Sequence, residues 1–204
     1  MARPKNQTVR RNQLIEAAKR AIAHHGLNGL QSKDVAAEAG LSAGSVAYYY
    51  PDLTDLIRDV HQRELDRFYW ERLHEVESAQ DPRTQLGMAV TSGIPKSGGD
   101  IDYQVLNEMH VQAFRDPFHA RLMANLFERE VSLYLSILDS GVRKGVFELR
   151  APDRTVARNI VALEDAYGLH ILGGSSVSVE QALSLLLTYV ESAVGCELAI
   201  AAGS

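Results

Sequence analysis

The sequence SKDVAAEAGLSAGSVAYY, residues 32–49, decides how the N-terminal part of the chain folds. Its apolar positions recur at helical spacing on both sides of a glycine and predict two short helices, over 32–39 and from 42 or 43 to 49. Gly40 permits a sharp turn between them, and the small residues around it let the helices cross closely. This spacing is typical of a helix-turn-helix, here residues 31–50, although a tight corner in any helical protein gives the same pattern.

The second helix of such a motif lies in the major groove of DNA with its first residues at base edges. Serine hydroxyls can donate to bases or phosphates, an alanine methyl can contact a thymine methyl, and glycine allows close approach of the backbone. Tyrosine hydroxyls and lysine can bind phosphate oxygens, which positions the protein without reading sequence. The residues of the predicted DNA interface are Lys33, Ser42, Ala43, Gly44, Ser45, Tyr48 and Tyr49.

Residues 10–61 as a whole resemble the N-terminal domain of the tetracycline-repressor (TetR) family of bacterial transcription regulators. The matching positions keep their order and spacing: Leu14, Ile15, Ala18, His25, Gly26, Asp34, Val35, Ala36, Ala39, Gly40, Leu41, Ser42, Gly44, Ser45, Val46, Tyr49, Tyr50, Pro51 and Leu56. The resemblance implies a homodimer that binds a palindromic operator, usually as a repressor, and is released by a small-molecule effector bound in the C-terminal domain.

A few positions depart from the family's pattern. Members often have Lys at the position of Leu53 and Lys or Arg at that of Ala43, so phosphate contacts would shift to Lys33 and to an N-terminal arm that can enter a minor groove. The cations of this arm are Arg3, Lys5, Arg10 and Arg11. Fewer phosphate contacts predict a shallower salt dependence of binding. The family's hydroxylated helix cap falls at Gln31, so we expect Ser32 to cap helix 32–39 one residue late.

Apolar side chains at three- and four-residue spacing predict helices along the rest of the chain, and no convincing alternating strand occurs. The further expected helices are 14–25, 53–79, 83–91, 103–114, one from 117 to beyond 138, 156–171 and 179–199. The predicted fold class is therefore all-α, with about nine helices. We expect a DNA-binding domain over residues 8–60 and an effector-binding and dimerisation domain over 61–204.

Composition and charge fit an ordinary globular protein, with 46% hydrophobic and 23% charged residues. No apolar run approaches the roughly 20 residues of a membrane span, and the start lacks the apolar core of a secretory signal, so we expect a cytoplasmic location. Residues 1–50 carry seven Lys or Arg and only three Asp or Glu, although the whole chain has a net charge of -5. A basic N-terminal part suggests an anionic partner there, or else a solubilising tail.

The last predicted helix is apolar on nearly all sides, which requires that it be covered on all sides. A partner subunit is the expected cover, with an interface formed by the last two helices, about residues 155–199. The alternative is a core helix inside a monomer.

Aromatic and polar side chains on the C-terminal helices predict a small-molecule site. The candidate ligand-binding residues are Trp70, Tyr103, Asn107, His110, Phe114, Phe127, Glu164, Tyr167 and His170. Each aromatic ring can instead be core packing, and each histidine a structural group. A buried carboxylate needs a partner, so Glu164 or Asp165 would bind a cationic or hydroxylated effector, or pair with Arg158 or an arginine of a second subunit.

No motif predicts an enzyme, a cofactor or a metal site: the sequence has no phosphate-binding loop, dinucleotide glycine fingerprint or nucleophile elbow. One cysteine, Cys196, excludes an internal disulfide and a multi-cysteine zinc site. The alternative to a DNA-binding regulator is an all-α small-molecule-binding protein or enzyme without DNA binding. That alternative leaves residues 32–50 unexplained.

Overall fold

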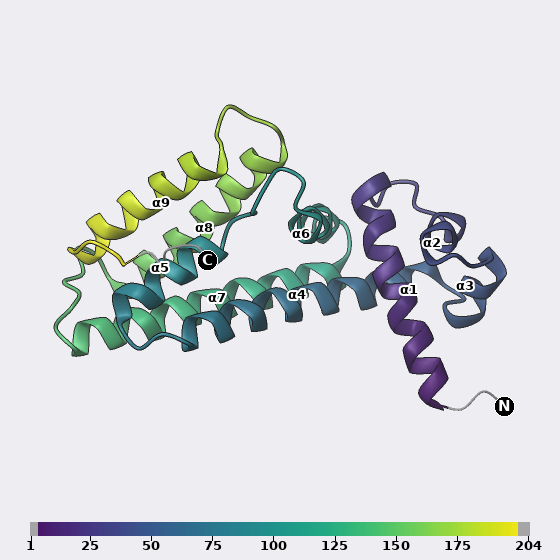
Figure 1. The fold of residues 1–204 in the computed structure, drawn as a ribbon, viewed down its shortest axis with the longest axis horizontal. Helices are drawn as coiled ribbons and strands as arrows, with labels where there is room; N and C mark the ends of the chain where they lie inside the picture. Colours follow the sequence, from purple (N-terminus) through teal and green to yellow (C-terminus); the bar gives the residue numbers. More distant parts are fainter. Residues whose placement is uncertain (1–3, 200–204) are drawn as a thin grey trace. The chain divides into compact units, whose positions relative to one another are not determined.

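The computed structural model describes residues 4–199, and within them the chain forms nine α-helices and no β-strand (Figure 1). This confirms the all-α prediction. The helices are α1 (Pro4–His25), α2 (Ser32–Ala39), α3 (Ala43–Tyr49), α4 (Leu53–Glu77), α5 (Pro82–Ser92), α6 (Ile101–Ala113), α7 (Pro117–Arg143), α8 (Asp153–Leu172) and α9 (Val179–Val194).

The helix ends differ from the sequence-based expectation mainly at the two ends of the chain. Helix α1 begins at Pro4, about three turns before the apolar stripe that starts at Leu14, because residues 7–13 include no buried side chain and leave no apolar periodicity in the sequence. Helix α9 ends at Val194 rather than at residue 199. The cause is Gly195, which adopts a left-handed conformation with φ 72° and whose N–H bonds the Glu191 carbonyl.

The described residues form two compact units, and the division into a DNA-binding domain up to residue 60 and an effector-binding domain after it stays a prediction. Unit 1 contains residues up to Asp66 together with Ile101–Met123, and unit 2 contains Arg67–Asp100 and the residues from Ala124 onward. The long helices α4 and α7 each contribute to both units.

Unit 1 has a core in which α6 packs with the N-terminal helices. Val105 and Met109 of α6 are completely buried in the same cluster as Leu14, Val35 and Val46. Polar contacts reinforce this packing: Lys19 of α1 pairs with Glu64 of α4 at 3.1 Å and with Asp102 of α6. The helix-turn-helix therefore rests on a scaffold that includes α6.

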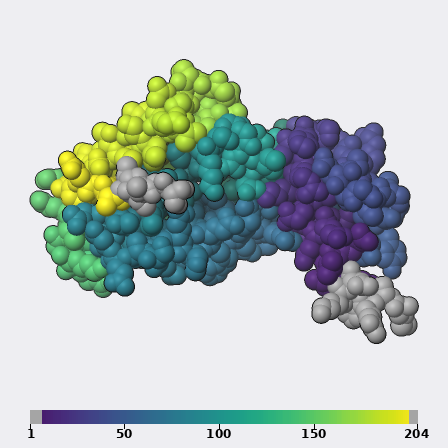
Figure 2. Space-filling view, in the orientation of Figure 1, coloured from purple at the N-terminus to yellow at the C-terminus, as the bar shows by residue number. Residues whose placement is uncertain are grey.

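Unit 2 has its own core, formed by α5, the later parts of α4 and α7, and helices α8 and α9. In the space-filling view the segment from α8 to α9, yellow-green to yellow, forms one exposed edge of this unit (Figure 2). Among the described residues, no helix is both long enough and apolar enough to cross a bilayer.

Candidate functional site

The turn between α2 and α3 depends on a glycine. Gly40 has φ 64°, in the left-handed region that side chains with a Cβ rarely adopt. Its N–H bonds the carbonyl of Ala37, and the N–H of Leu41 bonds that of Ala36 at 2.9 Å. These bonds end α2 within one residue and set the start of α3 directly after it.

The start of α2 is closed by Asp34 rather than by Ser32. The Asp34 carboxylate accepts a hydrogen bond from the backbone N–H of Gln31 at 2.8 Å, and Gln31 is the residue before the helix. The prediction that Ser32 caps the helix is therefore wrong, because Ser32 already lies in the first turn. An acidic side chain in this turn also matches the positive end of the helix dipole.

Helix α3 is held in place by the buried side chain of Val46 and, at its start, by the Ser42 cap. The Ser42 hydroxyl oxygen accepts from the backbone N–H of Ser45 at 3.2 Å, and the two serine hydroxyls lie 3.0 Å apart. Val46 is completely buried. At the end of the helix the buried Tyr50 donates its hydroxyl to Asp59 of α4 at 2.7 Å. Burial raises the pKa of Tyr50, and the bond to Asp59 raises it further.

The residues predicted to meet DNA lie at the surface of unit 1. Lys33, Ser42, Ala43 and Gly44 are exposed, and Tyr48 is 69% exposed. Ser45 and Tyr49 are partly buried, and the rings of Tyr48 and Tyr49 meet edge to face at 5.0 Å. The structure thus gathers a polar and aromatic face on α3, while its contact with DNA remains a prediction.

The predicted N-terminal arm is partly outside the described residues, which include neither Arg3 nor the side chain of Lys5. Arg10 donates to Gln13 on the same helix at 2.9 Å. Arg11 donates to the carbonyl of Tyr49 at 3.3 Å, and its guanidinium lies 4.7 Å from the centre of the Tyr50 ring. In this structure Arg11 therefore contacts the end of α3.

Leu53, the other departure from the family's pattern, is partly buried against the core of unit 1. Its side chain extends the apolar packing of unit 1 at the first turn of α4. It carries no charge that could bind a phosphate.

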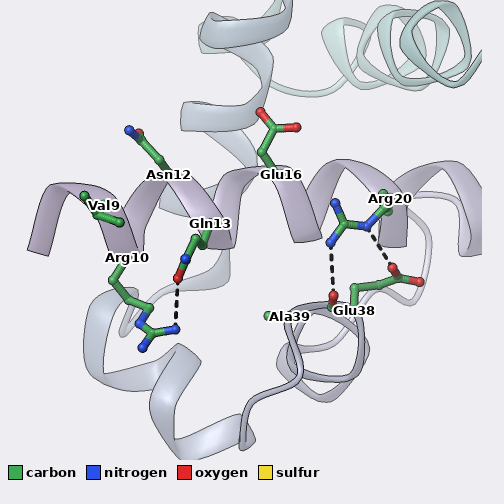
Figure 3. Close-up of a pocket in the computed structure, with 8 residues that line it drawn as sticks. All are labelled: Val9, Arg10, Asn12, Gln13, Glu16, Arg20, Glu38 and Ala39. Carbon is green, nitrogen blue, oxygen red and sulfur yellow. Dashed lines mark hydrogen bonds and ion pairs between the residues drawn. The ribbon is translucent and has the colours of Figure 1, made fainter. Parts of the chain in front are cut away.

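An open groove of about 510 Å³ runs along α1 in unit 1, with Glu38 and Ala39 of α2 on its other side (Figure 3). Its two arginines are held within the protein: Arg10 bonds Gln13, and Arg20 bonds both the side chain and the carbonyl of Glu38. Glu38 also accepts from His24, and these bonds to His24 and Arg20 lower its pKa. None of the predicted ligand-binding residues lines this groove.

The predicted ligand-binding residues are divided between the two units. Unit 1 contains Tyr103, Asn107, His110 and Phe114, and unit 2 contains Trp70, Phe127, Glu164, Tyr167 and His170. Phe114 is 83% exposed, Trp70 is 58% exposed and His170 is exposed. Phe127 and Tyr167 are partly buried against the core of unit 2, and Glu164 is buried.

Glu164 belongs to a buried charge cluster in unit 2, which we call the Arg72 cluster and which consists of Arg72, Glu130, Tyr134 and Glu164. The Arg72 guanidinium donates through Nη1 to Glu130 and through Nη2 to both carboxylate oxygens of Glu164, at 3.1 and 3.3 Å. Nη2 also lies 2.9 Å from the Ala89 carbonyl oxygen. Tyr134 donates its hydroxyl to Glu164. Each member of the cluster is at most 6% exposed.

Aromatic rings surround the guanidinium of this cluster. It lies 5.2 Å from the centre of the Phe68 ring and 5.8 Å from that of Tyr134. On the same two helices, the Arg129 guanidinium lies 3.9 Å from the Tyr69 ring and 5.6 Å from the Trp70 ring. Carboxylates and aromatic faces together form an environment suited to a cation.

Both carboxyl groups of the cluster hold protons more tightly than usual. Burial raises the pKa of Glu130 to about 8, opposed by Arg72 and assisted by the charge of Glu164. Burial likewise raises the pKa of Glu164 to about 7, opposed by Arg72 and by the Tyr134 hydroxyl. The pKa of the Tyr134 hydroxyl is raised by burial and by the same carboxylates.

The residues predicted from the sequence include Glu164 but not its partners. Of the alternatives left open for Glu164, the structure shows pairing with Arg72 and not with Arg158, which pairs with the exposed Glu128 at 2.7 Å. Arg72 stands four residues after Phe68 and four before Val76 on one helix face, and Glu130 stands four before Tyr134. A charged residue at the helical spacing of an apolar stripe is the signal that could have identified both.

Gly93 makes room for the Glu164 carboxylate. A Cβ at this position would lie 1.9 Å from the carboxylate oxygen, so a side chain here would displace Glu164.

Unit 1 contains a second buried polar group that the sequence analysis missed, the histidine pair His61 and His119. Their rings stack at 4.9 Å, their Nδ1 atoms lie 2.7 Å apart, and Nε2 of His61 lies 3.3 Å from the Met123 sulfur. Burial, together with the charges of His119 and His110, lowers the pKa of His61 to about 3. Burial also lowers the pKa of His119, opposed by Asp116.

Helices α8 and α9 keep apolar side chains at the surface of unit 2. Leu169 is 59% exposed and Leu185 is 51% exposed. The inner side of α9 is buried in the core through Ala182, Leu186 and Val190. Helix α9 thus has one face in the core of unit 2 and another face that the described residues leave exposed to solvent.

Comparisons with known proteins agree with this architecture. Residues 14–60 match the model of the family described as bacterial regulatory proteins, tetR family. The chain is 28% identical over 189 residues to the HTH-type transcriptional regulator BetI of Burkholderia cenocepacia, covering 90% of this chain and 93% of that protein.

Solved structures show the same fold. A putative transcriptional regulator from Saccharomonospora viridis in complex with choline is similar with a TM-score of 0.84 and 22% identity, over 92% of this chain and 98% of that one. A TetR transcription regulator from Haloarcula marismortui is similar with a TM-score of 0.81 and 23% identity, over 92% and 99%. The helix-turn-helix segment of this chain thus matches the tetR family model, and the whole chain is similar to TetR-family transcriptional regulators, among which ligand-responsive repression is typical.

Proposed function

We propose that this protein represses transcription by binding a palindromic operator as a homodimer, and that a small-molecule cation releases it. The observation that carries the proposal is the exposed face of α3. Val46 and the Ser42 cap fix this helix, while Ser42, Ala43, Gly44 and Tyr48 remain at the surface. Polar groups held in a rigid arrangement at a surface suit an external partner.

The dimer would form through α8 and α9. Leu169 and Leu185 are large apolar side chains, each more than half exposed, and a second copy related by a two-fold axis would cover them. Two copies of α3 could then enter successive major grooves about 34–36 Å apart.

The effector would bind at or beside the Arg72 cluster. Two buried carboxylates face one guanidinium there, and aromatic rings border the same helices. The choline complex of the Saccharomonospora viridis regulator supports a cation with a quaternary ammonium group as the class of effector. An effector that binds better to the form of the protein that cannot bind the operator would shift the population toward that form.

This function requires no catalysis, and we expect the protein to act in the cytoplasm, where its operator is. The rival function, an all-α binding protein or enzyme without DNA binding, predicts no effect of α3 substitutions on any DNA duplex.

The test is fluorescence anisotropy of a labelled duplex from the promoter of the protein's own gene. The variant Tyr48→Phe removes one proposed phosphate contact from each subunit of the dimer. It should therefore bind the duplex at least about tenfold more weakly than the unaltered protein does. Tyr69→Phe, which removes a hydroxyl from α4 in unit 2, should bind as the unaltered protein does. Leu185→Glu should sediment as a monomer and lose operator binding.

Choline is the probe for the effector, and its uncharged carbon analogue 3,3-dimethylbutan-1-ol is the control. Choline should release the duplex and the analogue should not. Equal operator binding by Tyr48→Phe, Tyr48→Ala and the unaltered protein would overturn the assignment of α3. Release by neither compound, or by both alike, would overturn a cationic effector.

A further inference from the structure

The Arg72 cluster contains one more acidic group than it contains cations. Arg72 comes from α4, Glu130 and Tyr134 from α7 and Glu164 from α8, while α5 contributes the Ala89 carbonyl. Asp165, the next residue of α8, lies outside the cluster, and its charge raises the pKa of both glutamates. Two nearby arginines of α8, Arg154 and Arg158, pair with the exposed Glu128 of α7.

Burial makes this excess of acid groups consequential. Glu130 and Glu164 are 6% and 1% exposed, so water cannot stabilise a second negative charge. A buried carboxylate that lacks a full counter-charge takes up a proton instead. One guanidinium can balance one carboxylate, so the cluster is neutral only when it also holds one proton.

The hydrogen bonds indicate which carboxyl group holds the proton. Glu164 accepts bonds from Nη2 of Arg72 on both oxygens and a further bond from the Tyr134 hydroxyl. These bonds favour its ionised form. Glu130 accepts from Nη1 of Arg72 on one oxygen, Oε1. The hydrogen bonds therefore favour Glu130 as the group that carries the proton, while burial raises the pKa of both carboxyl groups.

We infer that Glu130 and Glu164 hold a single proton between them in the ligand-free protein, and that an organic cation bound beside them displaces it. The second part rests on the proposed function. The exchange is balanced: one cation enters, Glu130 loses one proton to solvent, and the cluster stays neutral. Effector affinity then rises with pH, by up to about tenfold per pH unit while the cluster is protonated.

The shared proton can be tested without any effector. The pKa of Glu130 is higher in the folded protein than its ordinary value, so the folded state keeps a proton that the unfolded state has lost. The unfolding equilibrium constant should therefore increase with pH between 7 and 8, above the range in which the histidines of the unfolded chain titrate, by up to about tenfold per pH unit. Urea unfolding followed by the fluorescence of Trp70, the single tryptophan and a residue of unit 2, measures this change.

Either Glu130→Gln or Glu164→Gln should abolish this increase, because each leaves one carboxylate for one guanidinium. Glu128→Gln, an exposed position on α7, should retain it. If the two cluster variants show the same increase as the unaltered protein, no proton is shared there and the inference is overturned. Using both variants keeps the test decisive if one of them fails to fold.

The exchange is tested by calorimetry of choline binding at pH 7 in two buffers that differ in ionisation enthalpy. We expect the release of about one proton per choline bound, and none in Glu130→Gln. Choline binding without proton release overturns the exchange. If choline does not bind while the pH dependence of unfolding behaves as described, the shared proton stands, and both the exchange and the cationic effector of the proposed function fail.

Discussion

Each unit of this protein buries a polar cluster, and the two clusters are opposite in charge behaviour. The histidine pair of unit 1 joins two neutral rings through Nδ1 atoms 2.7 Å apart. The Arg72 cluster of unit 2 joins one guanidinium to two carboxyl groups. Burial disfavours the charged form in both, which lowers the pKa of His61 and raises the pKa of Glu130 and Glu164.

The comparison shows how the same desolvation gives opposite responses to pH. A folded state that binds fewer protons than the unfolded chain loses stability as the pH falls, and one that binds more loses stability as the pH rises. Unit 1 should therefore be sensitive to acid and unit 2 to base. The neutral pair needs no counter-ion, whereas the charged cluster depends on one arginine.

The largest effect is expected when that arginine is removed. In Arg72→Met the two carboxyl groups lose their guanidinium in a buried site, which should lower the free energy of unfolding by about 3–5 kcal/mol at pH 8. The loss should shrink at pH 6, because both carboxyl groups can then be protonated. Urea unfolding at the two pH values measures the difference.

An exposed arginine of the same unit is the matched control for Arg72. Arg158 pairs with Glu128 while its side chain is 49% exposed, and the change Arg158→Met should cost only about 0–1 kcal/mol. Equal stability of Arg72→Met and Arg158→Met would show that the buried cluster contributes nothing that an apolar side chain cannot replace.

An intermediate effect is expected from the histidine pair, in the opposite pH range. The pKa of His61 is lowered to about 3, so its contribution to stability is complete above the ordinary histidine pKa of 6.5 and is lost as the pH falls. Between pH 7.5 and 5 the free energy of unfolding of the unaltered protein should fall by about 2 kcal/mol relative to that of His61→Asn, since the Arg72 cluster contributes equally to both proteins. His61→Asn places an amide near the position of Nδ1 without a titrating ring, and it should lack this loss.

His74, an exposed residue later on the same helix, provides the control. Between pH 7.5 and 5, the free energy of unfolding of His74→Asn should change by the same amount as that of the unaltered protein. If His61→Asn behaves in the same way as His74→Asn between pH 7.5 and 5, burial of the histidine pair does not cause the sensitivity of the protein to acid.

The difference between the units also explains what the sequence could predict. The helix-turn-helix is local: Gly40, Val46 and the Ser42 cap lie within a few residues of one another, so their spacing alone indicates the turn and both helices. The Arg72 cluster joins residues 58 and 92 positions apart, from Arg72 to Glu130 and to Glu164. The sequence pattern of one helix does not indicate which charged residue of another helix will pack against it.

The extent of unit 1 illustrates the same limit. Residues 101–123 belong to this unit because Val105 and Met109 enter its core and Glu108 accepts from the backbone N–H of Leu27 at 3.1 Å. The α6 sequence reads as an ordinary amphipathic helix, and its apolar face carries no mark of the partner it packs against. The order of residues along the chain therefore does not show that 101–123 pack into the same core as the N-terminal helices.

The smallest effect concerns a serine helix cap that occurs once in each unit. Ser42 begins α3 and Ser178 begins α9, and in each case the hydroxyl oxygen accepts from a backbone N–H three residues later at 3.2 Å. Either change to alanine should cost about 1 kcal/mol of stability, because the same hydrogen bond is lost. Only Ser42→Ala should also weaken operator binding beyond what its lower stability explains, since only α3 is proposed to meet DNA. Thermal unfolding and anisotropy of both variants make the comparison, and equal operator affinities at a temperature where both are folded would remove Ser42 from the interface.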